Sequence, residues 1–417
     1  MSRYKNVAVI GAGITGVTTA YSLLNRGFNV TVFDRNRYSA METSFANGGQ
    51  LSASNAEVWT QWSTIFKGIK WMFEPNAPLL VNPKPSWHKY SWMAEFMANI
   101  PNYEANTVET VKLAIEARKY LLSFAKEEGF DFDCEQKGIL HIYKDAKELS
   151  HARKVNALLA KGGLERREIS ESEAKTIEPT LSGKLEGAFY TESDFTGDIH
   201  QYSANLSAAC QNKGGRFEYN ANITSLEHQS SGVNVFWEDA DDHDGETQHQ
   251  HFDAVVICAG VQSRRLAAKL GDRVNVYPVK GYSITVNMDD EASANAAPWV
   301  SLLDDQAKIV TSRLGEDRFR IAGTAEFNGY NKDIRNDRID PLIKWCERHF
   351  PGVSTEHVIP WAGLRPMMPN MMPKVGAGKK VGVFYNTGHG HLGWTLSAAT
   401  AESVAELVFA DAQSAVA

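Results

Sequence analysis

The sequence contains little cysteine and no long uninterrupted run of apolar residues. Its four cysteines lie far apart among 417 residues and fit no spacing typical of a metal or redox motif. We therefore expect small, buried thiols in a protein of a reducing compartment. No apolar run approaches the roughly 20 residues that a membrane-spanning helix needs. The cysteines are Cys134, Cys210, Cys258 and Cys346.

An excess of positive charge is also missing. The formal net charge is -7, and lysine and arginine are scattered along the chain, so we expect no nucleic-acid partner. The chain passes from Met-Ser-Arg-Tyr-Lys-Asn directly into an apolar segment, which leaves no room for a signal peptide. This pattern predicts a cytoplasmic protein.

The most informative feature that is present is a glycine motif near the N-terminus. Gly11, Gly13 and Gly16 directly follow an apolar run, and Asp34 ends the next one. This spacing is typical of a strand, a tight turn and a helix that bind the pyrophosphate of a dinucleotide, with the acidic residue on the ribose hydroxyls. The acid at position 34 disfavours a 2'-phosphate, and therefore NADP.

The segments around this motif support the same prediction. We expect a strand over 7–10, a helix over 14–26 that ends at Gly27, and a returning strand over 29–33. A second apolar segment, Phe252–Gly260, suits a buried parallel strand beside the first. This context favours a dinucleotide site over glycines that serve packing alone.

Farther along the chain, helices are predicted over 108–128 and 146–159 and a strand over 138–143. Residues 238–251 are rich in Asp, His, Gln and Glu, as in an exposed hairpin tip. The spacing of the histidines in that tip is irregular, so we expect no metal. They are His243, His249 and His251. The length exceeds that of one core and predicts two interleaved domains.

Residues 57–100 carry half of the ten tryptophans, mixed with phenylalanines and prolines. One interpretation is an aromatic surface that docks on a membrane, with Lys67 and Lys70 near the lipid headgroups. The other is a set of core anchors in a substrate domain, which we favour because tryptophan is largely buried in most folds. The tryptophans are Trp59, Trp62, Trp71, Trp87 and Trp92.

A second glycine-rich segment lies near the C-terminus. Gly388, Gly390 and Gly393 precede an alanine-rich stretch that predicts a helix over 397–409. Backbone N–H groups at such a junction can face an acceptor. A nicotinamide enzyme has no evident use for this segment, whereas the pyrimidine edge of a flavin carries carbonyl oxygens and N1.

With these segments the chain resembles the FAD-dependent D-amino acid dehydrogenases, within the D-amino acid oxidase and glycine oxidase superfamily. The resemblance covers nearly the whole chain. Besides the N-terminal glycine motif, it rests on Glu-Thr-Ser-Phe-Ala-Asn-Gly-Gly-Gln at 42–50, Ile-Lys-Trp-Met-Phe at 69–73, Tyr-Pro-Val-Lys-Gly-Tyr-Ser at 277–283, Gly-Leu-Arg-Pro-Met at 363–367 and Asn-Thr-Gly-His-Gly-His-Leu-Gly-Trp-Thr at 386–395.

The resemblance implies an α/β fold in two discontinuous domains. A Rossmann-like FAD-binding domain of the glutathione-reductase type would comprise 1–56, 104–128, 197–272 and 361–417. An interleaved α+β substrate domain, built on an antiparallel sheet, would comprise 57–103, 129–196 and 273–360.

The resemblance also implies the residues that contact FAD. Ile223 is expected to meet the adenine through its backbone, and binding should be non-covalent because the C-terminal flavin segment has no cysteine. The implied contacts are Gly11, Gly13, Ile14, Thr15, Gly16, Asp34, Arg35, Ser44, Asn47, Gly48, Gln50, Leu51, Ile223, Gly260, Gly388, His389, Gly390, His391, Leu392, Gly393 and Thr395.

The implied reaction is oxidative deamination of D-amino acids to 2-oxo acids and ammonia. A hydride would pass from the substrate Cα to flavin N5, and the electrons would go on to a quinone or another acceptor. Arg365 would grip the substrate carboxylate with its planar fork, and Tyr282 would donate its hydroxyl to that carboxylate.

Three alternatives stay open at this point. An oxygen-using oxidase of glycine, sarcosine, proline or hydroxyproline would share the implied fold. A nicotinamide-dependent dehydrogenase would need the N-terminal motif alone, and a non-catalytic flavoprotein would retain the site without turnover. Family habit and the aromatic segment also leave open a peripheral contact with the inner face of the plasma membrane.

Two segments depart from the family pattern. Relatives usually have a small residue such as threonine where this chain has His391, so we expect His391 to tune the flavin differently. Met367–Met372 replaces a more polar segment. Near the pocket, its flexible thioethers would favour apolar or cyclic side chains in the substrate; elsewhere they would be ordinary packing.

Overall fold

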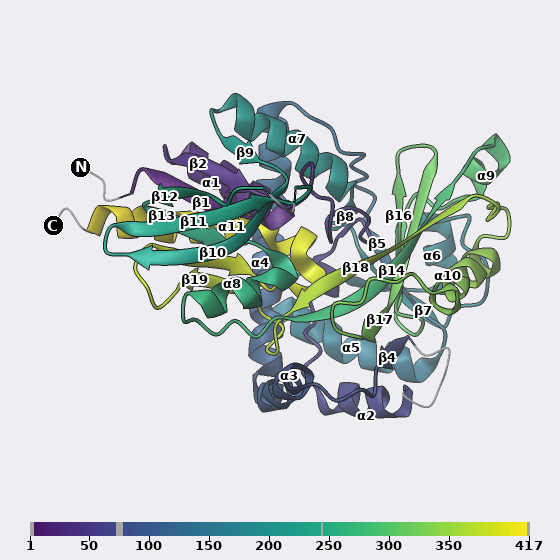
Figure 1. The fold of residues 1–417 in the computed structure, drawn as a ribbon. Coiled ribbons are helices and arrows are strands. Elements are labelled where there is room, and N and C mark those ends of the chain that lie inside the picture. Colours follow the sequence, from purple (N-terminus) through teal and green to yellow (C-terminus); the bar gives the residue numbers. More distant parts are fainter. Residues whose placement is uncertain (1–3, 72–77, 243–244, 415–417) are drawn as a thin grey trace.

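The structure is a computed structural model that describes residues 4–71, 78–242 and 245–414, with side chains omitted for 69–71. It consists of two bodies, one on each side of Figure 1, and both termini lie at the outer end of the same body. Residues 72 and 73, which belong to one of the segments that carry the resemblance, lie outside the described residues.

The first body is built on a six-stranded sheet in the order β19-β20-β13-β1-β2-β9. Neighbouring strands are parallel except at β19, which runs antiparallel to β20. The central strands are nearly continuous runs of apolar residues, as expected for a sheet covered on both faces. The strands are β1 (Asn6–Ile10), β2 (Asn29–Phe33), β9 (Arg216–Glu218), β13 (Ala254–Ile257), β19 (Lys374–Ala377) and β20 (Val383–Thr387).

Helices cover one face of this sheet, and a small antiparallel sheet covers the other. Each layer shares an apolar core with the parallel strands, so the body has three layers (Figure 1). The helices are α1 (Ile14–Asn25), α4 (Tyr103–Glu128), α7 (Ile199–Asn212) and α11 (Gly393–Ser414). The opposite layer contains β10 (Ala221–Gln229), β11 (Gly232–Asp239), β12 (Gln248–Phe252) and α8 (Ser263–Lys269).

The second body is built on a nine-stranded, mostly antiparallel sheet in the order β18-β14-β17-β16-β15-β5-β7-β6, with β4 beside β17. The long strands β14 and β18 reach toward the first body (Figure 1). The strands are β4 (Leu79–Val81), β5 (Ile139–Tyr143), β6 (Arg167–Ile169), β7 (Gly187–Thr191), β14 (Tyr277–Asn287), β15 (Ser301–Asp304), β16 (Ile309–Leu314), β17 (Arg318–Phe327) and β18 (Val358–Met367).

The remaining elements cover the second body or join the two. The apolar face of α10 packs on the large sheet, and α5 packs against α4. These helices are α2 (Trp62–Trp71), α3 (Trp87–Ala98), α5 (Ala146–Lys161), α6 (Glu171–Ile177), α9 (Glu291–Ala296) and α10 (Asn336–His349). A two-stranded pair, β3 (Gln50–Leu51) and β8 (Phe195–Thr196), and the 3-10 turns η1 (Ala53–Asn55), η2 (Ile100–Asn102), η3 (Gly260–Gln262) and η4 (Gly390–Leu392) complete the chain.

The elements predicted from periodicity are confirmed, with shifted ends. The first helix ends at Asn25, and the helix expected from residue 108 begins earlier, at Tyr103. It ends as predicted before Gly129, whose φ of 68° needs a residue without a side chain. Within the segment expected to run beside the first strand, β13 pairs in parallel with β1. The domain boundary expected at residue 361 falls inside β18, which belongs to the large sheet.

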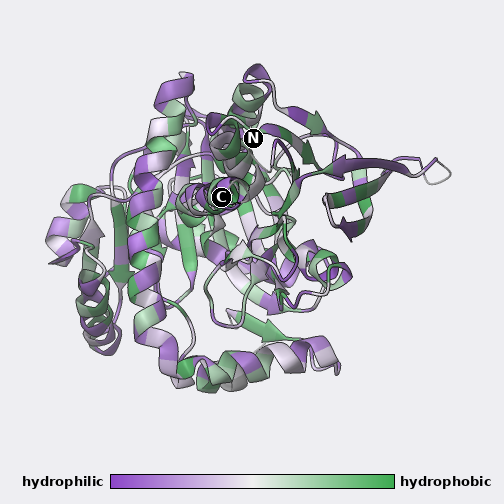
Figure 2. Cartoon of the chain, turned by 90° about the vertical axis from the view of Figure 1, so that its left-hand side faces the viewer, coloured by the Kyte–Doolittle hydropathy of each residue, from purple (hydrophilic) through white to green (hydrophobic). Residues whose placement is uncertain are grey.

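Residues 238–242 and 245–251 of the hydrophilic segment belong to the antiparallel β11–β12 hairpin, which projects from the body (Figure 2). His249 and His251 lie exposed on β12, and His243 lies outside the described residues. Among the described residues, no group of His, Cys, Asp and Glu side chains is arranged to hold a metal ion.

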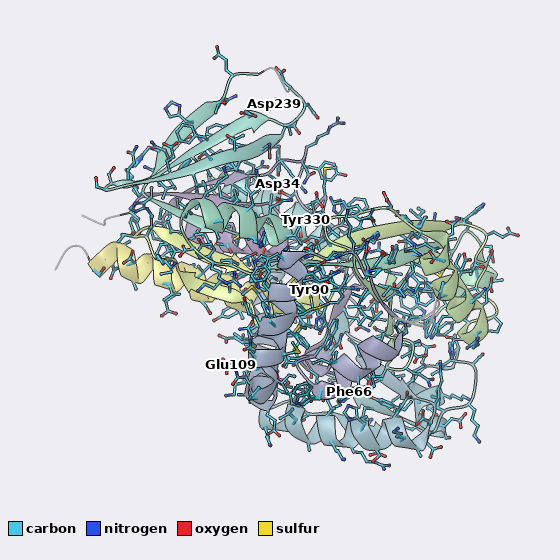
Figure 3. All side chains as sticks on the ribbon, turned by 60° about the horizontal axis from the view of Figure 1, so that its bottom comes forward. Asp34, Phe66, Tyr90, Glu109, Asp239 and Tyr330 are labelled. Carbon is cyan, nitrogen blue, oxygen red and sulfur yellow. The ribbon has the colours of Figure 1, made fainter. Side chains whose placement is uncertain are left out.

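The aromatic segment 57–100 is only partly a set of core anchors. Trp92 and Phe96 are buried, but Trp62, Phe66 and Trp87 are 57%, 66% and 81% exposed. The preference for core anchors is therefore wrong for these three residues. The reason is that α2 and α3 lie on the surface, where Phe66 and Tyr90 are exposed (Figure 3), and α3 buries only one side, formed by Lys89, Trp92 and Phe96. Trp71 has no described side chain, and Phe73 lies outside the described residues.

The four cysteines are unpaired. Three of them are buried, and Cys134 is half-buried, so the expectation of small core side chains holds for most of them. In the described parts of the chain, no helix is both long and apolar enough to cross a membrane.

Candidate active site

A cavity of about 840 Å³ lies between the two bodies. One end is formed by the glycine motif and Asp34, and the other by β14, β17 and β18 of the large sheet. The C-terminal segment 387–395 forms the wall between these ends. Residues far apart in the sequence therefore share one continuous space.

The glycine motif opens the N-terminus of α1 into this cavity. Gly11 has a φ of +107°, and a Cβ on Gly16 would lie 1.7 Å from the Gly11 carbonyl oxygen. Gly16 thus permits close contact between the turn and the helix, although it does not line the cavity itself. The Ile14 N–H donates to Ser44 Oγ at 3.0 Å, which fixes the segment at 44 against the helix start.

Asp34 lies where β2 ends and is held by the glycine turn. Its Oδ2 accepts from the Ala12 N–H at 2.7 Å, and its Oδ1 accepts from the Asn36 N–H at 2.9 Å. Burial raises the pKa of Asp34, while these hydrogen bonds act in the opposite direction. Oδ1 also accepts from Asn36 Nδ2 at 2.9 Å, so Oδ2 is the oxygen that retains a lone pair for a ribose hydroxyl.

The C-terminal glycines carry the chain past the middle of the cavity. Gly388 and Gly390 have φ values of +78° and +60°. A Cβ on Gly388 would lie 2.4 Å from Met368 Cγ, and one on Gly390 would lie 2.8 Å from Met367 Sδ. Both glycines are therefore required for the close approach of the methionine segment, and α11 begins directly after this turn.

The methionine segment is divided between cavity and core. Met367 lines the cavity, and its carbonyl accepts from Trp92 Nε1 at 2.8 Å. Met371 is buried with Trp92, while Met372 Sδ accepts from Thr110 Oγ1 at 3.1 Å. The segment therefore has both expected roles: Met367 contributes to the pocket, whereas Met371 and Met372 serve ordinary packing.

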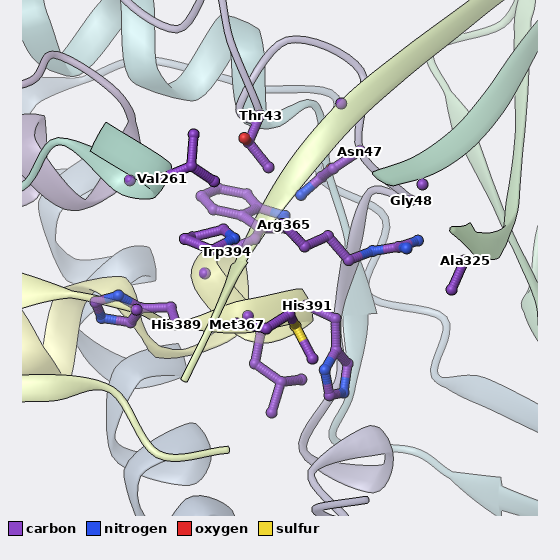
Figure 4. A pocket seen from close by; sticks show the side chains of 18 of the residues that line it. Thr43, Asn47, Gly48, Val261, Ala325, Arg365, Met367, His389, His391 and Trp394 are labelled. Carbon is purple, nitrogen blue, oxygen red and sulfur yellow. The ribbon is translucent and has the colours of Figure 1, made fainter. Parts of the chain in front are cut away.

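Arg365 projects from β18 into the cavity (Figure 4). Its Nη1 donates to the Thr324 carbonyl at 3.0 Å, and no described carboxylate forms a salt bridge with it. Burial lowers the pKa of Arg365 to about 10, so the side chain stays cationic at neutral pH. A half-buried cation in a cavity wall, without a carboxylate partner among the described residues, can bind the carboxylate of a ligand.

Tyr282 lines the same end of the cavity, but its hydroxyl has a partner. It donates to Glu326 Oε2 at 2.6 Å, and the same oxygen lies 3.2 Å from Lys280 Nζ. Burial and Glu326 raise the pKa of Tyr282, so its proton stays in this hydrogen bond. The geometry therefore does not favour the expected donation from Tyr282 to a substrate carboxylate, because a buried neighbouring anion holds the proton.

The two histidines flanking Gly390 have different surroundings. His389 is buried, and its Nε2 lies 2.9 Å from Thr400 Oγ1. His391 stacks on Trp59, with ring centroids 4.4 Å apart and planes at 18°. Burial lowers the pKa of each to about 3, and for His391 the charge of Arg365 adds to this effect. Both rings are therefore neutral at physiological pH.

Nearly all of the expected FAD and substrate residues line the cavity. The exceptions are Gly16 and Leu51. Leu51 is fully buried in the core of the first body, because neighbouring residues of a strand face opposite sides and Gln50 takes the cavity side. The Ile223 carbonyl accepts from Arg265 Nη2 at 3.1 Å. The others on the wall are Thr15, Arg35, Asn47, Gly48, Gly260, Leu392, Gly393 and Thr395.

Sequence reasoning missed several residues of the wall. Trp59 was expected to be a core anchor and not a wall residue, and Thr324 and Lys308 carried no local signal, because they come from a strand interior and a turn. Gly281 lay within one of the segments that carry the resemblance, but nothing in that segment indicated contact with an arginine.

The described residues suit FAD. The α1 N-terminus fits the pyrophosphate, Asp34 the ribose and the backbone around Ile223 the adenine. The segment 388–395 offers backbone groups to the flavin ring. Gln50 Oε1 and Trp394 Nε1 are buried atoms of the wall that have no hydrogen-bond partner in the described chain, so a polar cofactor would supply one.

Comparison with known proteins leads to the same cofactor. Residues 6–407 match the family described as DAO, FAD dependent oxidoreductase. A protein named D-amino acid dehydrogenase 3, from Mesorhizobium japonicum, is 60% identical over 405 residues, which are 97% of each chain. A D-amino acid dehydrogenase from Paramagnetospirillum magneticum is 38% identical over 413 residues, 96% of this chain and 94% of that protein. A nicotinamide cofactor is therefore not supported.

Solved structures share the fold at low identity. A glycine oxidase from Geobacillus kaustophilus has a TM-score of 0.76 at 21% identity, covering 98% of this chain and 95% of its own. An L-proline dehydrogenase from P. horikoshii has a TM-score of 0.73 at 16% identity, covering 98% and 94%. The family match, the relatives and this shared fold together show that the chain belongs to the DAO family of FAD-dependent oxidoreductases.

Proposed function

We propose that this protein is a D-amino acid dehydrogenase, which deaminates D-amino acids to 2-oxo acids and ammonia. The observation that carries the proposal is Arg365, a half-buried cation that faces the cavity without a carboxylate partner among the described residues and lies beside the segment suited to the flavin ring. The names of the relatives at 60% and 38% identity support the same substrate class.

In this proposal Arg365 binds the substrate carboxylate and thereby orients the rest of the substrate. Bound FAD supplies the acceptor for the hydride that leaves the substrate Cα. His389 and His391 stay neutral and are weak bases, because burial lowers the pKa of each to about 3. Neither histidine is therefore suited to take the proton of the substrate amine, and we expect the amine to react in its neutral form while the protein contributes mainly orientation and electrostatics.

The primary test is anaerobic reduction of the purified protein by added amino acids. Reduction is detected as bleaching of the flavin absorbance. D-Amino acids are expected to bleach the flavin, whereas L-amino acids should leave it oxidised. Bleaching by L-amino acids alone, or by none of the D-amino acids, would overturn the proposal. Glycine, sarcosine, proline and hydroxyproline are included, since an oxidase of these compounds is the alternative within the same fold.

The role of Arg365 is tested by Arg365→Ala. We expect KM to rise by about 100-fold or more and turnover to fall, while flavin stays bound, because a charge-assisted bidentate contact is lost. Arg37→Ala is the matched control, since Arg37 lies on the surface with a side chain 73% exposed. Unchanged kinetics in Arg365→Ala would contradict the carboxylate assignment.

We further propose that electrons pass to a quinone and not to oxygen. A cytoplasmic location with contact at the inner face of the plasma membrane would give access to this acceptor. The exposed Trp62, Phe66 and Trp87 support such a contact, because aromatic side chains partition into the lipid interface. The acceptor is tested by anaerobic reoxidation of the bleached flavin with a soluble quinone, compared with the rate in air-saturated buffer. Faster reoxidation by oxygen would favour the oxidase.

The membrane contact is tested by sedimentation with vesicles of phosphatidylglycerol and phosphatidylethanolamine. Replacing Trp62, Phe66 and Trp87 together by serine is expected to reduce the bound fraction. Ile359→Ser is the control, because Ile359 is a similarly exposed apolar residue on β18. Equal binding of both variants would contradict a role of the aromatic side chains.

A further inference from the structure

The strand opposite Gly281 contains an extra residue. In the antiparallel pair of β14 and β17, Lys280 lies opposite Glu326 and Tyr282 lies opposite Gly323. One residue of β14, Gly281, therefore faces two residues of β17, Thr324 and Ala325. This is a β-bulge, a feature that redirects side chains and is frequent beside active sites.

The bulge places Thr324 in an unfavourable backbone conformation. Its φ is 57°, in the left-handed region that β-branched residues rarely adopt. This conformation turns the Thr324 carbonyl to the cavity side, where it accepts from Arg365 Nη1 at 3.0 Å. A regular strand would use that carbonyl in the sheet, so the bulge provides an acceptor for the arginine.

Gly281 provides space for the same guanidinium. A Cβ on Gly281 would lie 2.3 Å from Arg365 Cζ and 2.4 Å from each terminal nitrogen. The guanidinium thus lies directly against the backbone of β14. Any side chain at position 281 would displace it.

The Thr324 side chain adds a polar group at this position. Thr324 is only 7% exposed and lines the cavity, and its Oγ1 has no hydrogen-bond partner in the described chain. An unpartnered buried hydroxyl is unfavourable, and a ligand with an acceptor would satisfy it.

Together these contacts point to a two-part carboxylate site. We propose that Gly281 and the Thr324 carbonyl position Arg365, and that the Thr324 hydroxyl, turned toward the cavity by rotation about χ1, donates a hydrogen bond to the substrate carboxylate beside Arg365. The proposal rests on the proposed function in that the carboxylate belongs to an amino acid. Gly281 is a positioning residue, whereas Thr324 both positions Arg365 and contacts the substrate.

The test measures binding of a carboxylate that cannot be oxidised. Propionate is titrated into the purified holoenzyme, and the change in the flavin absorption spectrum gives Kd. Thr324→Val keeps the branched shape and the carbonyl but removes the hydroxyl, so Kd is expected to rise about tenfold, as for loss of a hydrogen bond to a charge. Thr324→Ser keeps the hydroxyl and should bind propionate nearly as the wild type does.

The kinetics should separate a binding role from a structural one. For a D-amino acid substrate, most of the loss of kcat/KM in Thr324→Val should fall on KM. In the Arg365→Met background the same substitution should change propionate binding much less, because the two groups act on one carboxylate. Thr247→Val, on the exposed hairpin, is the control for introducing valine. Gly281→Ala should weaken propionate binding more than Thr324→Val does.

Each contrary result would overturn a specific part of the proposed carboxylate site. Wild-type affinity for propionate in Thr324→Val, or equal losses in the valine and serine variants, would overturn the hydroxyl contact. Wild-type affinity in Gly281→Ala would overturn the positioning role of that glycine. If D-amino acids fail to reduce the wild type but propionate binding still depends on Thr324 and Arg365, the proposed function fails and the carboxylate site remains.

Discussion

At the scale of single residues, the stacked pair of Trp59 and His391 shows how surroundings decide what a side chain does. The residue type at 391 suggested a group that could tune the flavin. Burial and the charge of Arg365 instead keep the ring neutral, with a pKa of about 3. This environment has consequences both for stability and for the pH dependence of the reaction.

The low pKa of His391 predicts a loss of stability in acid. In the unfolded chain the pKa of histidine is about 6.5, so below that pH the unfolded state binds a proton that the folded state does not. The free energy of unfolding therefore falls as the pH drops from 6.5 toward 3, and at pH 5 this one histidine accounts for about 2 kcal/mol. Denaturant unfolding at pH 8 and pH 5 should show a smaller difference in His391→Thr than in the wild type. An identical difference in both proteins would contradict the buried, neutral ring.

The same histidines predict how the reaction depends on pH. Because His389 and His391 do not titrate between pH 5 and 8, kcat/KM should rise with pH until the substrate amine loses its own proton. The midpoint should follow the amine pKa when the substrate is changed, and it should not move in His391→Thr. A midpoint that is the same for substrates of different amine pKa would instead indicate a base supplied by the protein.

At the scale of elements, the turn from β1 into α1 depends on two glycines for different reasons. A Cβ on Gly16 would meet the Gly11 carbonyl, which is backbone and cannot move aside. A Cβ on Gly13 would meet only Ser44 Oγ, at 3.3 Å, which a side-chain rotation can relieve. Gly16 is therefore needed by the fold, and Gly13 by the cofactor that approaches it.

Gly16→Ala should therefore lower stability as well as cofactor binding. We expect a loss of about 3 kcal/mol or more in the free energy of unfolding of the cofactor-free protein, since the clash is with backbone. Gly68→Ala in α2 is the control: its Cβ would make an ordinary contact with Leu79, and alanine favours a helix by up to about 1 kcal/mol. Equal stability of the two variants in chemical denaturation would contradict this reading of the turn.

Gly13→Val should abolish flavin binding while leaving the stability of the cofactor-free protein nearly unchanged. A Cβ at position 13 would meet only Ser44 Oγ, so the circular dichroism spectrum and the denaturation midpoint of the cofactor-free protein should stay close to the wild type. The purified protein should be colourless, because the branched side chain occupies the space above the helix N-terminus. A yellow variant with a normal ratio of flavin to protein would contradict the role of Gly13 in cofactor binding.

The elements also show what a sequence can and cannot predict. The strands at 7–10 and 29–33 and the helix end at Gly129 follow from local patterns of apolar residues and glycine. The bulge at Thr324 does not, because it depends on the register between two strands that are far apart in the sequence. The burial of Trp92 and the exposure of Trp87 likewise depend on which side of α3 packs, and the tryptophan content alone does not indicate that.

At the scale of the whole molecule, the family motifs indicated a cavity shared by distant segments, and nearly all the expected residues line it. The partner of a single side chain was harder to predict. Tyr282 was expected to face the substrate, but its hydroxyl donates to Glu326, a residue whose role is visible only once β14 and β17 are paired.

The mode of flavin binding is a prediction at this scale. Cys258 is the cysteine that lines the cavity, and burial raises the pKa of its thiol to about 12, so it is a poor nucleophile. Acid precipitation should therefore release all of the flavin into the supernatant. Flavin that stays with the precipitated protein and survives proteolysis on a peptide would contradict non-covalent binding.

Among the contacts that join the two bodies at the cavity is a β-bridge between Met367, at the end of β18, and His389. Arg365 is two positions before that bridge. The bridge therefore fixes the distance between the carboxylate site and the segment suited to the flavin ring. This fixed distance selects substrates by the number of bonds between the carboxylate and the carbon to be oxidised. A β-amino acid inserts one more carbon into that interval and should fail to reduce the flavin, however well its carboxylate is held.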